Sequence, residues 1–462
     1  MQKLLLIILI VLGLSITGKP QYITNVLEYN PAPGQLINEA PWGTPSAAQS
    51  IIGGIDGHLS LGAWGGYVVF EFASAVENNP DNPYGIDFTI FGNPMPDWSE
   101  PGIVWVMKDE NNNGLPDDLW YQLAGSDYHF SNTIRNYEVT YTNPDQDSAV
   151  DVPWNDNLGN SGYILANSIH TQPYYPLADS FPNISTTSYQ LNGTRIQPEV
   201  DSTSFMVKVL QRGFGYADNQ LKRTEPWTTP DNPYTTEIEN SGGDGFDISW
   251  AVDELGNSVV LDEIHFIKVQ NGMLADGSWL GEISTEISGA VDVSPNTNIS
   301  GVNQMVVIRD LPPIIREEYI ELEAMAFENG LLLSSENIVW STTSTGASID
   351  EENVLHLTQS GTIEITATME SNPEISAMAT ATVELSNSIN SFNLKDRLQL
   401  YPNPAKEYFI IEDNGLLEIR NQLGQIIIKE HTNKNDRINI SHLTNGIYLV
   451  SLNGRTVKLI KQ

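Results

Sequence analysis

One ten-residue stretch of the chain carries side-chain oxygens at a spacing that suits a calcium ion. Residues 109–118 read Asp-Glu-Asn-Asn-Asn-Gly-Leu-Pro-Asp-Asp. The oxygen-bearing side chains at positions one, three, five and nine belong to Asp109, Asn111, Asn113 and Asp117. A glycine at position six permits a sharp turn, and Leu115 at position seven offers its backbone carbonyl. The spacing therefore predicts a site for Ca²⁺, a hard cation that takes oxygen ligands.

The same stretch lacks the final ligand of a calcium loop of the EF-hand type. Position twelve is Trp120 rather than a bidentate glutamate, so Asp118 or a residue from another loop has to take that place. The flanking residues have the composition of strands, which predicts a calcium loop on a β scaffold. An ordinary hairpin turn rich in asparagine and glycine is the alternative. An ion held here would brace the loop rather than take part in chemistry.

Acidic residues beside glycine, proline and aromatic residues form a second group with possible chemistry. We expect a ligand-binding region to include Trp98, Glu100, Asp218, Asp244 and Asp247. Paired carboxylates are also what glycoside hydrolysis needs, and Asp87 joins the four acids as a candidate for that role. The chain has 58 acidic residues, so some pair can always be found. Turn residues or a second cation site are the simpler interpretation, and we assign no catalytic residue.

The histidines and the known catalytic motifs add no enzyme signature. His58, His129, His170 and His265 share no metal-ligand spacing, and His265 in an apolar run is expected to be structural. The sequence contains no His-Glu-x-x-His, no Gly-x-Ser-x-Gly, no phosphate-binding loop and no dinucleotide-binding fingerprint. We therefore expect a binding protein rather than an enzyme.

Aromatic residues in expected loops favour binding to sugars. Many lie beside proline, glycine or asparagine, and they include Trp42, Trp64, Trp98, Trp154, Tyr174, Tyr175, Trp227 and Trp279. Aromatic faces stack on sugar rings while neighbouring Asn and Asp side chains hydrogen-bond to hydroxyl groups. Filling the core of a large sandwich is the alternative for any single ring. The sequence predicts a non-catalytic glycan- or ligand-binding protein, with a secreted glycoside-active hydrolase as the alternative.

The composition excludes several classes of protein. The chain has no cysteine, which excludes disulfides, a thiol nucleophile, cysteine-based zinc sites and a lipidated cysteine anchor. Its formal net charge is −36, and the acidic excess lies before residue 395 because the remainder is slightly basic. Such an acidic body repels phosphate backbones, so we expect no nucleic-acid partner.

Short apolar runs separated by glycine, proline, asparagine and aspartate predict an all-β protein. The clearest runs are Tyr67–Phe72, Phe88–Phe91, Ile103–Met107, Ser204–Leu210 and Ile264–Val269. We expect three β-sandwich domains at residues 21–293, 301–386 and 398–462, with a polar linker at 387–397 before the last. The first domain holds nine of the ten tryptophans, so we place any specific activity there.

The first domain contains the motifs Leu-Gly-x-x-Gly-Gly at 61–66, Asp-Phe-x-x-Phe-Gly-Asn at 87–93, Ser-Glu-Pro-Gly at 99–102 and Gly-Gly-Asp-Gly-Phe-Asp at 242–247. With them it resembles the secreted "cell surface protein" domains of Bacteroidota and some other bacteria. The resemblance implies a jelly-roll-like β-sandwich without an established activity. Broad resemblance to Bacteroidota surface proteins adds a further alternative, the capture of a bulky nutrient such as a corrinoid.

The second domain contains an expected strand ending in Trp340-Ser341, then a turn, and then Gly-Thr-Ile-Glu-Ile-Thr-Ala over 361–367. In this order these features resemble the bacterial Ig-like modules of surface proteins. About 90 residues of alternating strands with one tryptophan suit a small sandwich. The resemblance implies a spacer, and we assign no chemistry to it.

The last residues contain a series of short motifs, which are Tyr-Pro-Asn-Pro at 401–404, Asn-Gln-Leu-Gly at 421–424, Ile-Ser-His-Leu at 440–443, Asn-Gly-Ile-Tyr at 445–448 and the final Lys458-x-x-Lys461. In this order they resemble the C-terminal sorting domain of the type IX secretion system of Bacteroidota. Short strand-like runs lie between them at 408–412, 416–420, 426–429 and 438–440. The resemblance implies export through the type IX secretion machinery to the outer-membrane surface or the medium.

The N-terminus is consistent with export. Met1-Gln-Lys3 is short and positive, residues 4–16 are almost wholly apolar, and small residues follow. An apolar run of this length predicts a secretory signal peptide over residues 1–18, because a membrane-spanning helix needs about 20 apolar residues. We expect no transmembrane segment and a secreted or surface-attached protein.

Overall fold

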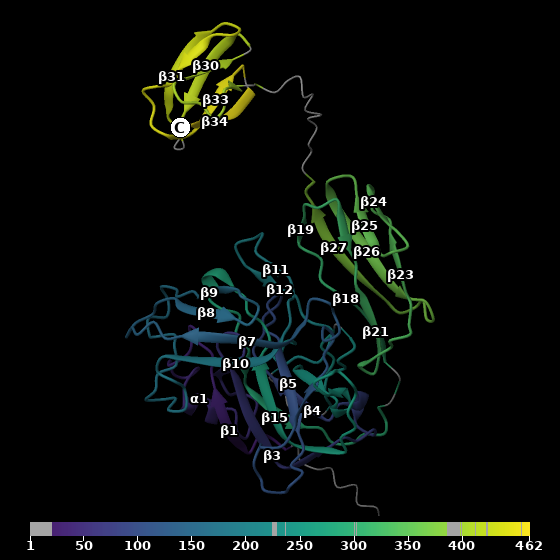
Figure 1. Cartoon of the computed structure of the whole chain (residues 1–462). Coiled ribbons are helices and arrows are strands. Elements are labelled where there is room, and N and C mark those ends of the chain that lie inside the picture. The colour runs from purple at the N-terminus through teal and green to yellow at the C-terminus, as the bar shows by residue number, and fades with distance from the viewer. Residues whose placement is uncertain are drawn as a thin grey trace, which may run out of the picture. The chain divides into compact units, whose positions relative to one another are not determined.

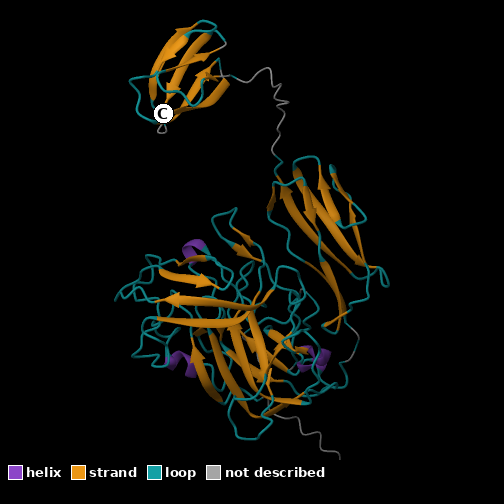
Figure 2. Cartoon of the chain, in the orientation of Figure 1, coloured by secondary structure: helices purple, strands orange, loops and turns teal. Residues whose placement is uncertain are grey.

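The computed structural model confirms an all-β protein. It describes residues 21–223, 229–235, 237–299, 301, 303–385, 398, 400–411, 413–421, 424–453 and 455–462. Among the described residues, strands make up 42% and helices 3%, and the strands form many antiparallel sheets (Figures 1 and 2). The chain divides into two compact units, residues 1–385 and 386–462. The predicted signal peptide and the linker at 387–397 lie outside the described residues.

The centre of the first unit is a six-stranded antiparallel sheet. Its strands, in spatial order, are β1 (Asn25–Asn30), β3 (Tyr67–Glu77), β15 (Glu263–Asn271), β5 (Gly102–Met107), β6 (Trp120–Leu123) and β14 (Ala251–Val252). Strands far apart in the sequence are neighbours here, since β15 pairs with both β3 and β5. The runs predicted at 67–72, 103–107 and 264–269 are therefore confirmed as adjacent strands.

Side chains alternate between the two faces of this sheet, because successive residues of a strand point to opposite sides. Phe70, Val104 and Ile267 are fully buried in the largest hydrophobic core. Lys268 lies opposite Trp105 on β5, and Gln270 lies opposite Tyr67 on β3. These four residues share the other face, so the sheet has one apolar face and one face of aromatic and polar side chains.

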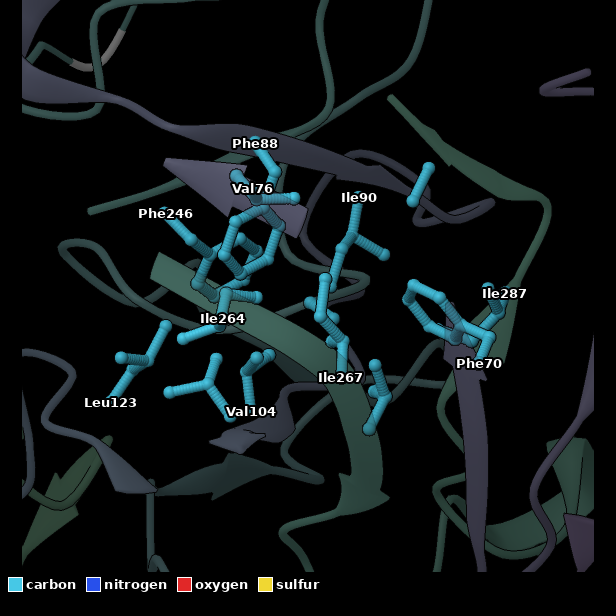
Figure 3. Close-up of a cluster of buried hydrophobic side chains, with 14 of the residues drawn as sticks. Phe70, Val76, Phe88, Ile90, Val104, Leu123, Phe246, Ile264, Ile267 and Ile287 are labelled. Atoms are coloured by element: carbon cyan, nitrogen blue, oxygen red, sulfur yellow. The ribbon is translucent and has the colours of Figure 1, made fainter. Parts of the chain in front are cut away.

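A smaller three-stranded sheet covers the apolar face. It consists of β13 (Asp244–Phe246), β4 (Phe88–Phe91) and β17 (Gly289–Asp292). Phe88 and Phe246 stack with their ring centroids 5.3 Å apart, and Figure 3 shows them with Ile264 and Ile267 of β15. Full burial of one such side chain stabilises the fold by about 1.5–3 kcal/mol, so this core fixes the position of β15.

A four-stranded sheet packs against part of the opposite face. It contains β10 (Ser188–Arg195), β7 (Ile134–Thr142), β8 (Val152–Asp156) and β9 (Ser161–Ile164). Trp64 and Tyr137 form the centre of a second hydrophobic core here, with ring centroids 4.8 Å apart. The Thr194 hydroxyl of β10 donates to Gln122 of β6 at 2.6 Å, which ties the two sheets together.

Short elements complete this part of the first unit. They are α1 (Pro45–Gln49), β2 (Leu59–Ser60), η1 (Pro83–Gly85), β11 (Val200–Asp201), β12 (Lys208–Val209), η2 (Ile248–Trp250), η3 (Ser278–Leu280) and β16 (Glu286–Ile287). The strand predicted at Ser204–Leu210 is wrong over most of its length. Phe205 is 82% exposed and belongs to the turn between β11 and β12, where Ser204 hydrogen-bonds to the Met206 carbonyl.

The second β module, residues 303–385, belongs to the same compact unit. Its strands are β18 (Gln304–Ile308), β19 (Ile314–Ile315), β20 (Tyr319–Glu321), β21 (Ala324–Glu328), β22 (Leu331–Leu332), β23 (Ile338–Thr342), β24 (Ala347–Ile349), β25 (Val354–Leu357), β26 (Gly361–Met369) and β27 (Ser376–Val383). Phe327 packs edge-on against Phe214 at 5.0 Å, and Trp250 donates to the Asn329 carbonyl at 2.9 Å. The module therefore shares a hydrophobic core with the first domain.

The second unit is a small two-sheet fold. Its strands are β28 (Leu400–Tyr401), β29 (Tyr408–Ile411), β30 (Gly415–Arg420), β31 (Ile426–Thr432), β32 (Arg437–Asn439), β33 (Gly446–Leu452) and β34 (Arg455–Lys461). The Asn403 amide donates to the Lys458 carbonyl at 2.6 Å and its oxygen accepts from Ile460 N at 2.9 Å. The Tyr-Pro-Asn-Pro motif thus fastens the start of the unit to its last strand.

Candidate ligand-binding cleft

Two adjoining cavities lie between the polar face of the six-stranded sheet and the strands β7 and β10. Their volumes are about 310 Å³ and about 380 Å³. Both are lined by Trp120, Glu138, Asn192 and Lys268, so they form one continuous region, which we call the Lys268 cleft. A concave site with aromatic walls and a few polar groups is the usual form of a small-ligand site.

Three aromatic rings surround Lys268 at the centre of the cleft. Its Nζ lies 4.7 Å from the ring centroid of Trp105, 5.1 Å from that of Trp120 and 5.8 Å from that of Tyr67. All four side chains are half-buried. Each ring attracts the ammonium by about 0.5–2 kcal/mol. Burial nevertheless lowers the pKa of Lys268 to about 8, although the nearby charge of Glu28 acts in the opposite direction.

The polar groups of the cleft belong to strands from both sheets. The Tyr67 hydroxyl donates to Glu28 at 2.6 Å on one side. On the other side the Gln190 amide donates to Glu138 at 2.7 Å. Gln190 and Asn192 are exposed on β10, and their amide groups can both donate and accept hydrogen bonds. The cleft thus combines flat apolar surfaces with paired donors and acceptors.

Gln270 borders the first cavity, and one of its two polar side-chain atoms has no hydrogen-bond partner among the described residues. Its Nε2 donates to the carbonyls of Gly65 and Asn192 at 3.0 and 2.9 Å. Its Oε1 is buried and has no hydrogen-bond partner among the described residues. A side chain at Gly193 would place its Cβ 2.1 Å from this oxygen, so glycine is needed there for β10 to approach the sheet.

The predicted calcium loop borders the same cleft. It connects β5 to β6, which confirms that its flanks are strands, and Pro116 and Asp118 line the two cavities. Asp109 is buried and accepts from Asn113 N at 3.1 Å and Gly114 N at 2.8 Å. Burial raises the pKa of Asp109, but these backbone donors outweigh it, and the pKa is lowered.

Amide groups of the loop gather around Asp117. Asn111 and Asn113 donate to its carboxylate at 3.1–3.3 Å, and Asp118 accepts from Glu110 N at 3.0 Å. Side chains of positions three, five and nine are therefore hydrogen-bonded to one another, whereas the carboxylates of Asp109, Asp117 and Asp118 do not meet in one three-acid group among the described residues. Trp120, at position twelve, lies in β6 and faces Lys268 instead. Calcium binding here stays a prediction.

A second group of oxygens forms a buried carboxylate cluster. Glu100, Asp218 and Glu286 each place a ligand atom within 4.8 Å of the others, and their side chains are 7%, 0% and 7% exposed. Asp218 accepts from Asn93 N and Glu286 N, both at 2.7 Å, and Glu100 accepts from Ser284 N at 3.0 Å. Carboxylate oxygens are the metal ligands that Ca²⁺ prefers.

The electrostatics of this cluster are unfavourable without a proton or a cation. Burial raises the pKa of Glu100 and of Asp218 well above the usual range, and the charge of Glu286 raises both further. Burial also raises the pKa of Glu286, against the effect of hydrogen bonds from Glu100, Ser284 and Ser60. Three like charges this close cannot all be ionised at neutral pH unless a cation compensates them.

The other sequence-predicted ligand residues are buried in structural positions. Trp98 packs against Ile103 in a small hydrophobic cluster. Asp244 accepts from the backbone of Asn219 and Gln220, and Asp247 accepts from that of Ser249. Asp87 accepts from the backbone of Asn79 and Ile248, and burial raises its pKa to about 8. None of these residues lines the Lys268 cleft, and their role in ligand binding stays a prediction.

The remaining sequence candidates have ordinary surroundings. His265 accepts from Asp109 N at 3.2 Å and so supports the loop. Trp64, Tyr174 and Tyr175 are buried in the second hydrophobic core. Trp42 and Trp154 are half-buried, while Trp279 is 39% exposed and stacks on Phe205. Trp227 lies outside the described residues.

Sequence reasoning missed the residues that make the cleft. Lys268, Glu138 and Asn192 stand in strands rather than loops, and Glu286 joins Glu100 only through the fold. One signal was present, because Ile267 and Val269 alternate with Lys268 and Gln270 along β15. That alternation identifies a polar sheet face but does not identify the strands beside it.

The C-terminal unit connects the chain to a known family. Residues 399–462 match the model of a family described as a secretion system C-terminal sorting domain. The chain is exported by type IX secretion. The protein is therefore secreted or attached to the outer surface of the cell, and its tail interacts with the type IX machinery. Among the described residues, no helix has the length and apolar character needed to cross a membrane.

Comparisons of the rest of the chain give weak likenesses. A search of curated proteins finds no match. The matches to solved structures include the following two, both with low scores. The extracellular cadherin domains 1–4 of protocadherin gamma B7 match 68% of this chain and 84% of their own, at 9% identity and a TM-score of 0.16. Domains 1–6 of the surface layer protein SbsC match 86% of this chain and 61% of their own, at 11% identity and a TM-score of 0.16.

Proposed function

We propose that the exported protein binds a glycan in the Lys268 cleft and does not cleave it. The observation that carries this proposal is the joint presence of aromatic faces and amide groups around one concave site. Trp120 and Tyr67 offer flat apolar faces to the pyranose ring. Gln190 and Asn192 are exposed beside them and offer donors and acceptors to hydroxyl groups.

The proposed calcium loop has a part in this function. Trp120 is the first residue of β6 and follows the loop directly, while Pro116 and Asp118 form part of the cleft wall. We propose that Ca²⁺, held by Asp109, Asn113 and their neighbours, braces the loop. A fixed loop holds the Trp120 ring in place before the ligand arrives, and this reduces the entropy lost on binding.

A glycan array tests the proposed function. The full chain should bind a restricted set of glycans, and Trp120→Ala should abolish that binding while the thermal melting temperature stays near that of the wild type. Trp279→Ala is the matched control, since Trp279 is exposed but lies outside the cleft lining. Loss of binding in Trp279→Ala but not in Trp120→Ala, or no bound glycan at all, would contradict the proposal.

The two alternatives from the sequence give different results in simple assays. A hydrolase releases reducing sugar from the bound glycan, and for the acids predicted from the sequence that release should vanish in Glu100→Gln or Asp244→Asn. Capture of a corrinoid gives visible absorbance that co-elutes with the protein. Either result would replace glycan retention as the function, whereas stable, uncleaved glycan on the protein supports it.

A further inference from the structure

The ammonium of Lys268 has no anionic partner within the cleft. Among the described residues its Nζ contacts aromatic rings, and no ion pair or hydrogen bond of this atom is present. The acid whose charge raises its pKa, Glu28, already accepts from the Tyr67 hydroxyl. Glu138 likewise accepts from Gln190. A half-buried cation without a partner is costly, and an anion in contact with it would remove that cost.

Neutral hydrogen-bonding groups beside Lys268 are also incomplete. Trp105 Nε1 is a buried donor without a partner among the described residues, and Trp105 lies directly across from Lys268 on β5. Buried polar atoms are usually satisfied, so the Trp105 donor lacks a partner that the described residues do not supply. The unpartnered Oε1 of Gln270 faces the backbone of Gly193 and, as an acceptor, gives no support to an anionic ligand.

We propose that the ligand of the cleft is an acidic glycan whose anionic substituent, a carboxylate or a sulfate, binds the ammonium of Lys268. This inference rests on the proposed function and specifies its ligand class. The sugar ring stacks on Trp120, and its charged substituent lies against Lys268 between the rings of Trp105 and Tyr67.

The ionisable groups around the cleft decide how binding depends on pH. The groups that face Lys268 or line the second cavity are Glu28 of β1, Tyr67 of β3, Asp118 of the calcium loop, Arg135 and Glu138 of β7, and Asp253 and Glu254 after β14. The pKa of Lys268 is about 8 in the free protein, and a bound anion raises it. Affinity for an acidic glycan should therefore be highest near pH 6, where the ammonium and the acidic substituent are both charged, and fall about tenfold by pH 9.

The acidic body of the protein limits this interaction to short range. With a net charge of −36, the molecule repels a polyanion at a distance. Salt at about 0.15 M screens that repulsion beyond about 8 Å, whereas the contact pair inside the cleft is screened much less. Short acidic oligosaccharides should therefore bind better at physiological salt than at very low salt.

Matched acidic and neutral probes test the inference. The full chain is titrated with each probe by calorimetry. The carboxylate pair is trigalacturonate and its methyl ester, and the sulfate pair is a carrageenan tetrasaccharide and its desulfated form. Comparison of the two pairs distinguishes a carboxylate ligand from a sulfate ligand. The acidic members should bind more tightly, and Lys268→Gln should weaken them about thirtyfold or more, the loss expected when one partner of a buried charge pair is removed. Lys268→Arg should retain the preference. Lys208→Gln, which removes an exposed lysine paired with Asp97, should change nothing.

The outcomes separate this inference from the proposed function. Binding of the neutral members alone, or of a neutral glycan from the array in place of the acidic probes, overturns the inference and leaves glycan binding intact. Acidic binding that persists unchanged in Lys268→Gln at both pH 6 and pH 9 also overturns it. Absence of any bound glycan overturns both.

Discussion

Replacement of Arg212 by methionine should destabilise the first unit strongly, because it leaves the buried carboxylate of Asp127 and the partly buried carboxylate of Asp310 without a partner. The Arg212 side chain is 5% exposed and donates to both oxygens of Asp310, each at 2.7 Å. Its Nε lies 3.1 Å from Asp127. Asp127 belongs to the first domain and Asp310 to the second β module, so this guanidinium joins the two parts of the unit.

The expected loss in the free energy of unfolding is about 3–5 kcal/mol, which is the usual cost of removing one partner of a buried ion pair. Burial raises the pKa of Asp127 to about 6, although the charge of Arg212 lowers it. Removal of that charge raises the pKa further. A raised pKa in the folded state gives stability that is present below the unfolded value of 3.8 and is lost as the pH rises through the folded value. The free energy of unfolding of the variant should therefore be lower at pH 8 than at pH 5.

Urea unfolding at pH 5 and pH 8 measures both effects. The triple variant Arg212→Met, Asp127→Asn, Asp310→Asn is the control, since it removes the orphaned charges and should recover most of the loss. A loss below about 1 kcal/mol, or an equal loss at the two pH values, would refute the reasoning that the triad is a buried, charge-coupled contact.

Three further predictions concern other parts of the chain. Asn403→Ala removes two hydrogen bonds to β34 and should lower the unfolding free energy of the C-terminal unit by about 1–2 kcal/mol, with the unfolding transition of the first unit unchanged in calorimetry. Removal of calcium by EGTA should lower the melting temperature of the wild type, and Asp109→Ala should abolish this response; an unchanged response would count against the calcium loop. Burial raises the pKa of Glu282 from 4.5 to about 8. The free energy of unfolding should therefore fall as the pH rises between these two values, by up to about 1.4 kcal/mol per pH unit. Glu282→Gln should make this pH dependence weaker when unfolding is measured across the same range.

Local patterns were enough to predict much of the fold. Alternating β-branched and aromatic residues identified β3, β5 and β15, since burial of one face imposes a two-residue period. The tail motifs predicted the sorting domain within one residue of its matched start. The same reasoning failed at Ser204–Leu210, where an apolar run lies at the tip of a hairpin and Phe205 is exposed. Composition cannot distinguish an exposed aromatic turn from a strand.

The candidate site was harder to predict because its residues are far apart in the sequence. Tyr67, Trp105 and Lys268 become neighbours only through the order β3-β15-β5 of the sheet. Likewise Glu100 approaches Glu286 across almost two hundred residues. The glycines around Asp244 suggested a ligand-binding residue in a turn, but the Asp244 carboxylate accepts hydrogen bonds from the backbone amides of Asn219 and Gln220. Long-range pairing of strands decides these contacts, and a single sequence holds little information on it.

The most direct test of the central claim is a crystal structure of the chain with the glycan that the array selects. We expect electron density for a sugar ring on Trp120, with a polar substituent in contact with Lys268. Density for the sugar elsewhere, for example on the exposed Trp279 and Phe205 pair, would contradict it.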